Sequence, residues 1–519
     1  MKYRQRSLPC HPVNLAADAL ALALAAGLPL VMPNGYIGLI GYKFDLLLYS
    51  TLATVAVLLF SWIFWRRGKT AVRRFAPAWL WPVGVCASYA VAWFFAQDRE
   101  TAFWGLPGRK NGLLLLLLCT AVYGLIALFS SGGIVPLFYR VLVATGCVVT
   151  LLSWLNYWMI DPLDAYYAFL PEKGELFLGT VGNINFYGAL LCLCVPLAAG
   201  AYLQGTGKKQ PWRYAAALLL CSGLIPAGSD GAWLGCAVAV LALCCTQNTT
   251  THVLARLCRL FAGLSACAMV TRLLCTVLPF RAELRTVSAG LGRPLTGGCL
   301  LLLSALGAWL LARKPSRHAA VAMRVVCIGL FVLCAAAFLA ANLLTSVPEW
   351  LSFLHFDERW AANRGYAWQK LWVIYTEDMT PLQKLFGLGG DAVKARLNPD
   401  IESIRYMTLL NGDIFDSAHN EFLQHLVCGG AAGLFCWCGF LFTALRRGFR
   451  NFPPLGAALL GYAVQSFFSI SMPGVFPLVF VLAALAGTAP SPPATGNTAR
   501  VVAAGGLLCV AGVLMMLFS

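Results

Sequence analysis

The chain has 519 residues, of which 60% are hydrophobic and only 11% are charged, and its formal net charge is +17. This apolar content excludes a soluble fold, because a soluble protein of this size needs a polar surface, and apolar runs of about 20 residues are typical of spanning helices rather than barrel strands. The positive charge does not indicate a nucleic-acid partner, since the basic residues form short clusters between apolar runs.

In chain order, the first apolar run, about 15–32, is predicted to span the membrane, and the three basic residues among the first six indicate a cytoplasmic N-terminus. The runs that follow predict about eleven spans within residues 1–346. Basic clusters follow the second, sixth, eighth and tenth spans, which assigns that side to the cytoplasm. The turn at 281–293, with three arginines, departs from this pattern.

The 20 cysteines do not indicate a disulfide framework. Most stand inside apolar runs, for example Cys192, Cys194, Cys436 and Cys438, and the polar segment 347–418 contains none. They are interpreted as small packing residues. Cys436 and Cys438 are not expected to form a zinc site, because no His or Cys partner lies at ligand spacing from them.

Residues 347–418 are predicted to form one long extracytoplasmic loop, because basic clusters lie at the far ends of the spans on either side of it. Trp360–Thr380 has the pattern of an amphipathic helix at the membrane surface. Its apolar residues recur at spacings of three and four: Trp368, Leu371, Trp372 and Tyr375. Leu388-Gly389-Gly390-Asp391 is predicted to be a turn.

After this loop, residues 419–488 are expected to contain three more spans, followed at 489–519 by a linker and a last apolar helix. The whole chain is therefore predicted to be an all-α, polytopic transmembrane bundle of about 12–15 spans with one long extracytoplasmic loop.

A histidine stands where the long loop turns into the next apolar helix. Asp416 or Ser417 is expected to cap that helix, which places His419 in its first turn. The positive end of the helix dipole disfavours imidazolium, keeps the ring neutral as a general base requires, and attracts an anion such as a diphosphate. The alternative is a capping histidine that only anchors the helix at the interface.

Four segments together resemble the O-antigen ligase and polymerase superfamily, membrane glycosyltransferases that use lipid-linked oligosaccharides. They are Gly182–Gly188, Ser229–Gly235, the segment from Arg364 to Gly389, and Asp416–Gln424. In order, they look like the family's glycine–asparagine motif, its serine–arginine–glycine turn, its arginine–tryptophan helix with a glycine turn, and its histidine–asparagine motif. Their order, spacing and placement on one membrane side agree over about 180–440.

This resemblance implies that an oligosaccharide is transferred from undecaprenyl diphosphate to an acceptor hydroxyl on the outer face of the cytoplasmic membrane. His419 then takes the acceptor's proton, and Arg364 binds the diphosphate through its planar fork. The alternative for Arg364 is a headgroup contact. The substrate-binding residues that the resemblance implies are Asn183, Asn185, Ser229, Arg359, Gly389, Asn420 and Glu421. Asn420 and Glu421 either orient the histidine or serve as capping and interfacial groups.

One residue departs from the family pattern. Asp230 stands where the family often has an arginine that is thought to help hold the lipid diphosphate. The candidates to replace that arginine are Arg281, Arg285, Arg359 and Arg405. Otherwise Asp230 is a turn residue, for which Asp-Gly is well suited. No cofactor and no metal are expected, since arginines can stabilise the leaving group and no aspartate-rich motif is present.

Two other functions remain open. A polysaccharide polymerase of the same superfamily differs from a ligase only in its acceptor. A transporter or flippase of lipid-linked glycans belongs to another class, but transporters place ionisable residues near the membrane midplane, and here they lie mainly in loops. The expected partners are the undecaprenyl diphosphate-linked oligosaccharide, a glycan or lipid acceptor, and membrane lipids, with no nucleic acid.

Overall fold

The structure is a computed structural model that describes residues 12–64, 77–166, 176–246, 249–277, 284–313, 316, 318–343, 348, 354–397, 415–488, 501 and 503–507. Most of the predicted linker and last apolar helix at 489–519 lies outside these residues.

The described elements are almost all helices. The first half of the chain forms α1 (Pro12–Leu30), β1 (Pro33–Tyr36), α2 (Leu39–Phe64), the 3-10 helix η1 (Pro77–Trp79), α3 (Leu80–Phe95), α4 (Arg99–Trp104), α5 (Leu113–Phe129), α6 (Val135–Tyr157), β2 (Phe177–Leu178), β3 (Gly182–Asn183), α7 (Ile184–Gln204), α8 (Gln210–Ser222), α9 (Leu224–Ala227) and α10 (Asp230–Cys244). The second half forms α11 (Thr251–Val277), α12 (Thr286–Gly292), α13 (Pro294–Arg313), α14 (Ala319–Leu343), α15 (Trp360–Val373), the π-helix η4 (Ile374–Asp378), α16 (Pro381–Phe386), α17 (Val393–Leu397), α19 (Glu421–Asn451), α20 (Pro453–Gln465), the 3-10 helix η5 (Ser466–Phe468) and α21 (Phe476–Ala486). β2 and β3 pair antiparallel, with Phe177 opposite Asn183.

Among the described residues, nine helices are long and apolar enough to cross a membrane. They are α1, α2, α3, α6, α7, α11, α13, α14 and α19. Three shorter apolar helices, α5, α10 and α21, stand among them. The predicted all-α, polytopic fold is confirmed, and the chain is a multi-pass membrane protein.

The centre of the bundle is α7, in which almost every residue is buried. It packs against α6, α8, α10 and α20. Small residues allow the close approach that spanning helices need: a Cβ added at Gly235 in α10 would lie 2.5 Å from the carbonyl oxygen of Gly461 in α20. The 18 cysteines among the described residues are free thiols, and eight of them are buried. These eight are packing residues, as predicted, whereas Cys299, Cys334 and Cys438 are exposed.

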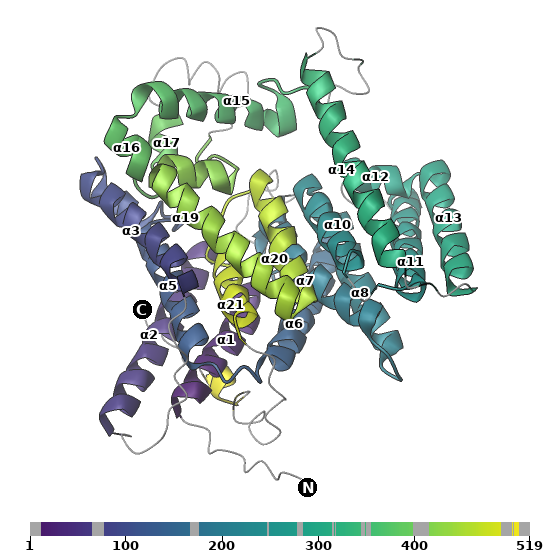
Figure 1. The fold of residues 1–519 in the computed structure, drawn as a ribbon, viewed down its shortest axis with the longest axis horizontal. Helices are drawn as coiled ribbons and strands as arrows, with labels where there is room; N and C mark the ends of the chain where they lie inside the picture. Colours follow the sequence, from purple (N-terminus) through teal and green to yellow (C-terminus); the bar gives the residue numbers. More distant parts are fainter. Residues whose placement is uncertain are drawn as a thin grey trace.

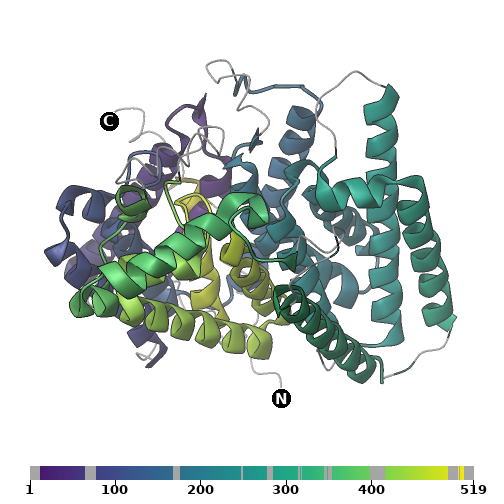
Figure 2. The same ribbon diagram turned by 90° about the horizontal axis from the view of Figure 1, so that it is seen from above.

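Two groups of helices stand at the edge of this bundle. In Figure 1, α11, α13 and α14 form one side, away from α2, α3 and α5. The outer helices α13 and α14 expose nearly all of their apolar side chains, as helices that face lipid do. α15 and α16 lie crosswise over one end of the bundle, near the start of α19 (Figures 1 and 2).

The predicted amphipathic helix is present as α15 and η4, but its buried face differs from the one expected. Leu371 is fully buried, whereas Trp372 is 57% exposed. The buried residues of this segment are Gly365, Ala367, Leu371 and Ile374. Trp368 still faces the bundle, because its indole contacts Phe467 and Phe468 of η5.

Candidate functional site

His419 lies just before its helix, whereas the sequence predicted that it lies in the first turn. α19 begins at Glu421, and Asn420 is its N-cap: the Asn420 Oδ1 accepts from the backbone N–H of Phe422 at 3.0 Å and of Leu423 at 3.1 Å. The prediction that Asp416 or Ser417 caps the helix is wrong, as is the placement of His419 in the first turn. His419 precedes the cap with a φ of +46°, a left-handed conformation that histidine adopts more readily than most residues.

Ala418, the residue before His419, is hydrogen-bonded through both its backbone N–H and its backbone carbonyl. The Ala418 N–H donates to Gln424 Oε1 at 2.9 Å, and the Ala418 carbonyl accepts from Trp368 Nε1 at 2.9 Å. Gln424 belongs to α19 and Trp368 to α15. The histidine loop is therefore anchored to both the spanning helix and the crosswise helix.

Two arginines from distant parts of the chain act on the imidazole. Arg109, between α4 and α5, donates from Nε to Asp416 Oδ2 at 2.8 Å and from Nη2 to Asp416 Oδ1. Burial, together with the positive charges of Arg109 and Arg364, lowers the pKa of His419 to about 4, although Asp416 acts in the opposite direction. The imidazole is therefore neutral at physiological pH.

Arg364 follows a left-handed turn within α15. Ala361, Ala362 and Asn363 have φ values of +50°, +58° and +66°, and the Arg364 Nη1 donates to the Ala361 carbonyl at 3.0 Å. The Arg364 Nε is buried and has no hydrogen-bond partner among the described residues. Burial lowers the pKa of Arg364, and the negative charge of Asp230 offsets part of that effect. Asp230, the residue that departs from the family pattern, thus acts electrostatically on Arg364.

The glycine–asparagine segment Gly182–Gly188 and the serine turn at Ser229 contact each other, and their described hydrogen bonds do not involve His419. Asn183 caps α7, with its side chain accepting from the Asn185 N–H at 2.9 Å. The buried Ser229 donates to Asn185 Oδ1 at 3.0 Å. Gln465, at the end of α20, donates to the Asn185 carbonyl at 3.0 Å. These contacts hold the starts of α7 and α10 together beside the end of α20.

Three of the predicted binding residues differ in how exposed their side chains are to a ligand. Glu421 is fully buried, and its Oε2 accepts from the Tyr462 hydroxyl at 2.7 Å. Asn420 is buried and uses its side chain as the cap of α19. Arg359, just before α15, is exposed. The described contacts therefore assign capping and packing to Asn420 and Glu421, with no hydrogen bond that orients His419.

The glycine turn after α16 packs into a break in α19. Gly430 has a φ of +67° and a ψ of −175°, which interrupts the helix. The Val427 and Cys428 carbonyls, freed from their usual partners four residues later, accept from the N–H groups of Leu388 and Gly389, both at 3.0 Å. A Cβ at Gly389 would lie 2.9 Å from that of Ala102 in α4. Gly389 is thus required for close packing on α4.

Asp391 completes this turn and was not singled out from the sequence. It is buried with a φ of +52°, and its Oδ2 accepts from the backbone N–H groups of Leu106 at 2.8 Å and Asn111 at 3.1 Å. Burial raises the pKa of Asp391 to about 6, although those two hydrogen bonds and Arg109 act to lower it. Asp391 thereby holds the segment that carries Arg109.

Arg109 was not singled out from the sequence, because no local pattern marks a partner hundreds of residues away. Of the arginines expected to replace the family arginine at Asp230, Arg281 and Arg405 lie outside the described residues. Arg285 packs beside the turn itself: its Cδ lies 3.0 Å from the position of a Cβ added at Gly228.

Within the part of the chain that the structure describes, no group of three or more His, Cys, Asp or Glu side chains has the arrangement to hold a metal ion.

Comparison with protein families finds that residues 295–438 match the family described as O-Antigen ligase. The match covers α13, α14, the crosswise helices and the first half of α19, including Arg364 and His419. It confirms the resemblance to this superfamily, and it includes two of the four motif segments, while Gly182–Gly188 and Ser229–Gly235 lie outside it. A search of the curated proteins finds no match to the chain.

Proposed function

We propose that this chain, which carries an O-antigen ligase domain in residues 295–438, transfers an oligosaccharide from undecaprenyl diphosphate to an acceptor hydroxyl at the outer face of the cytoplasmic membrane. The family match supports ligase-like or polymerase-like work in the biosynthesis of cell-surface polysaccharide. The donor, the acceptor and the membrane face are our proposal.

The observation that carries this proposal is an imidazole that burial and the positive charges of Arg109 and Arg364 keep neutral. A general base must be unprotonated before the reaction, and the pKa of His419, lowered to about 4, meets that condition. The same positive charges that keep His419 neutral favour an anionic substrate beside it. A diphosphate leaving group fits that requirement.

In the proposed reaction, the acceptor oxygen attacks the anomeric carbon of the donor sugar while its proton passes to an imidazole nitrogen of His419. The bond between the anomeric carbon and the phosphate oxygen breaks, and undecaprenyl diphosphate leaves with the electron pair. The new negative charge develops on the diphosphate, where a guanidinium can stabilise it by charge-assisted hydrogen bonds.

Arg364 suits this second role better than Arg109. Both side-chain hydrogen bonds of Arg109 are directed at Asp416. Arg364 donates from Nη1 to a backbone carbonyl, and its buried Nε has no partner among the described residues. A phosphate oxygen would satisfy that donor. Arg109 then contributes charge and holds Asp416, while Arg364 binds the diphosphate.

The test uses purified full-length protein with a lipid diphosphate-linked oligosaccharide and two acceptors in separate reactions. One acceptor is a glycan that is not lipid-linked, and the other is a second lipid-linked unit. Transfer to the first supports a ligase, and transfer to the second supports a polymerase. Movement of the lipid-linked donor across liposomes without transfer to either acceptor would instead favour the flippase.

A further inference from the structure

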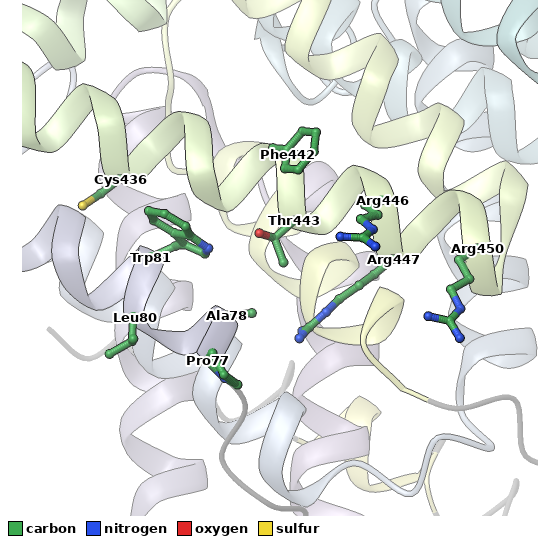
Figure 3. Close-up of a pocket in the computed structure, with 10 residues that line it drawn as sticks. All are labelled: Pro77, Ala78, Leu80, Trp81, Cys436, Phe442, Thr443, Arg446, Arg447 and Arg450. Carbon is green, nitrogen blue, oxygen red and sulfur yellow. The ribbon is translucent and has the colours of Figure 1, made fainter.

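The far end of α19 forms a basic pocket that the proposed reaction does not use. Arg446, Arg447 and Arg450 line it from α19, and Leu80 and Trp81 line it from the start of α3. The pocket has a volume of about 640 Å³. Figure 3 shows the three arginines on one side and the apolar residues of α3 on the other.

This pocket is well separated from His419. Arg446 is 25 residues beyond Glu421, which corresponds to about 38 Å of helix at 1.5 Å per residue before the break at Gly430 is considered. α19 is long and apolar enough to span a membrane. The two sites therefore lie at opposite ends of one spanning helix, and the arginines are too distant to touch a substrate at His419.

The chemistry of the lining is that of a charged headgroup above apolar chains. No acidic residue is found among the described residues that line the pocket, so the three guanidinium charges have no counter-charge within it. The other lining residues are mostly apolar, and Leu80 and Phe442 are 62% and 66% exposed. Such exposed apolar side chains beside α19 face the hydrocarbon of the bilayer.

We propose that this pocket binds an anionic phospholipid, with the phosphate on Arg446, Arg447 and Arg450 and the acyl chains along Leu80, Trp81 and Phe442. Arginine presents a planar fork to phosphate oxygens. Basic pockets between spanning helices bind anionic headgroups, and the apolar walls add contacts that a soluble phosphate cannot make. The proposal depends on the spanning of the membrane by α19 and α3, not on the reaction at His419.

Arg446 is the best residue for the test, since Arg450 also lines another pocket between α10, α14 and α20 and Arg447 is partly buried. The matched control is Arg313→Gln. Arg313 ends α13 and stacks on Trp309 at 3.5 Å, so it is a basic residue at a helix end outside this pocket.

The purified full-length chain in detergent is titrated with phosphatidylglycerol, with phosphatidylcholine of the same acyl chains, and with glycerol 3-phosphate, and binding is followed by native mass spectrometry. Wild type should bind phosphatidylglycerol about tenfold more tightly than phosphatidylcholine. Arg446→Gln should weaken phosphatidylglycerol binding about fivefold and leave phosphatidylcholine binding unchanged. Arg313→Gln should keep the wild-type values.

Three outcomes would overturn the proposal. Equal losses in Arg446→Gln and Arg313→Gln would show a general effect of charge. Equal affinities of wild type for the two lipids would remove the anionic preference. Binding of glycerol 3-phosphate as tight as that of phosphatidylglycerol would show a phosphate site with no lipid component. Because Arg446 is exposed, Arg446→Gln should have the wild-type Tm in phosphatidylcholine, which thermal unfolding checks.

Discussion

The guanidinium of Arg109 forms a two-pronged contact with the carboxylate of Asp416, 307 residues later in the chain: Nε donates to Oδ2 at 2.8 Å and Nη2 donates to Oδ1. This ion pair joins the segment between α4 and α5 to the loop that presents His419. Burial alone would raise the pKa of Asp416, but the charge and hydrogen bonds of Arg109 lower it below its usual value. The pair thus sets the position of the histidine loop and part of its electrostatic field.

Breaking this pair should cost both stability and transfer. We expect Arg109→Gln and Asp416→Asn each to lower the Tm, because each leaves one partly buried charge without its partner. The double variant should be no worse than the more severe single variant, which corresponds to a coupling of about 1–3 kcal/mol. Thermal unfolding of the four proteins measures the cycle. Additive losses would show that the pair contributes no stability.

Arg109 should also set the acid limb of the reaction. In wild type the rate should be constant from about pH 5.5 to 8 and fall as the pH approaches 4, where His419 becomes protonated. Since Arg109 lowers the pKa of His419, Arg109→Gln should move this fall to higher pH. Transfer rates across pH measure the shift. An acid limb near pH 6.5 in wild type would contradict a base with a pKa of about 4.

His419→Ala should leave the fold intact and reduce transfer about 10²–10⁴-fold, the usual contribution of a general base. Glutamine can donate or accept a hydrogen bond but cannot take the proton, so His419→Gln should be nearly as slow. The assay uses purified protein, lipid-linked donor and acceptor, with a chelator present. Near-normal turnover of His419→Gln would reduce His419 to a positioning residue, and loss of wild-type activity to the chelator would contradict the metal-free reaction.

Arg364→Lys retains the charge but loses the planar fork. We expect a large loss of transfer, on the order of 10²-fold or more, at a normal protein level. The matched control is Arg396→Lys in α17, an arginine of the same region that the proposed site does not use. Wild-type transfer by Arg364→Ala would show that Arg364 does not bind the diphosphate.

Asp391 should tolerate asparagine but not alanine. One side-chain oxygen accepts both hydrogen bonds from the segment at Leu106–Asn111, and asparagine supplies that oxygen and accepts the positive φ. Asp391→Ala leaves both N–H groups without an acceptor, at a cost of about 1–3 kcal/mol for an unsatisfied buried group. Thermal unfolding separates the two variants, and equal Tm values for Asp391→Ala and wild type would contradict this role.

The raised pKa of Asp391 also predicts a pH dependence. Between the usual carboxyl pKa of 3.8 and about 6, the folded protein holds a proton that the unfolded chain has lost. The free energy of unfolding therefore declines as the pH rises through this window. The Tm difference between wild type and Asp391→Asn should change across it and be constant above about pH 7.

The orientation in the membrane is a further prediction. We expect the segment that contains α15 and η4 to lie on the extracytoplasmic side of the cytoplasmic membrane and the turn between α7 and α8 to lie in the cytoplasm. Asp378→Cys and Lys208→Cys, at exposed positions on these two segments, should react oppositely with an impermeant thiol reagent in intact cells. The background replaces the accessible native cysteines. Labelling of Lys208→Cys but not of Asp378→Cys would show that the orientation is the opposite of the predicted one.

The fold class was predictable because apolar run length and the positions of basic clusters are local properties of a chain. A stretch of about 20 apolar residues must satisfy its backbone hydrogen bonds internally in lipid, which requires a helix wherever the run occurs. The four motif segments were recognisable for a similar reason, since each is continuous in the sequence. Their mutual contacts, such as that of Ser229 with Asn185, were not.

The start of α19 shows where local reasoning ends. Asp416, Ser417 and Asn420 have similar intrinsic preferences for a helix N-cap, so the sequence alone does not rank them. In the folded protein Arg109 engages the carboxylate of Asp416, and Asn420 caps the helix. The residue that caps the helix therefore depends on a contact between Arg109 and Asp416, which are 307 positions apart in the chain.

By itself the sequence determined an all-α membrane bundle, the presence of α15, and His419 and Arg364 as candidate groups, because each rests on residues close together in the chain. Only the tertiary structure decided the roles of Arg109, Asp391 and the break at Gly430. Each of these residues acts through a partner from a distant segment. Hydrogen bonds and charge interactions depend on distance in space, and that distance exists only once the helices have packed.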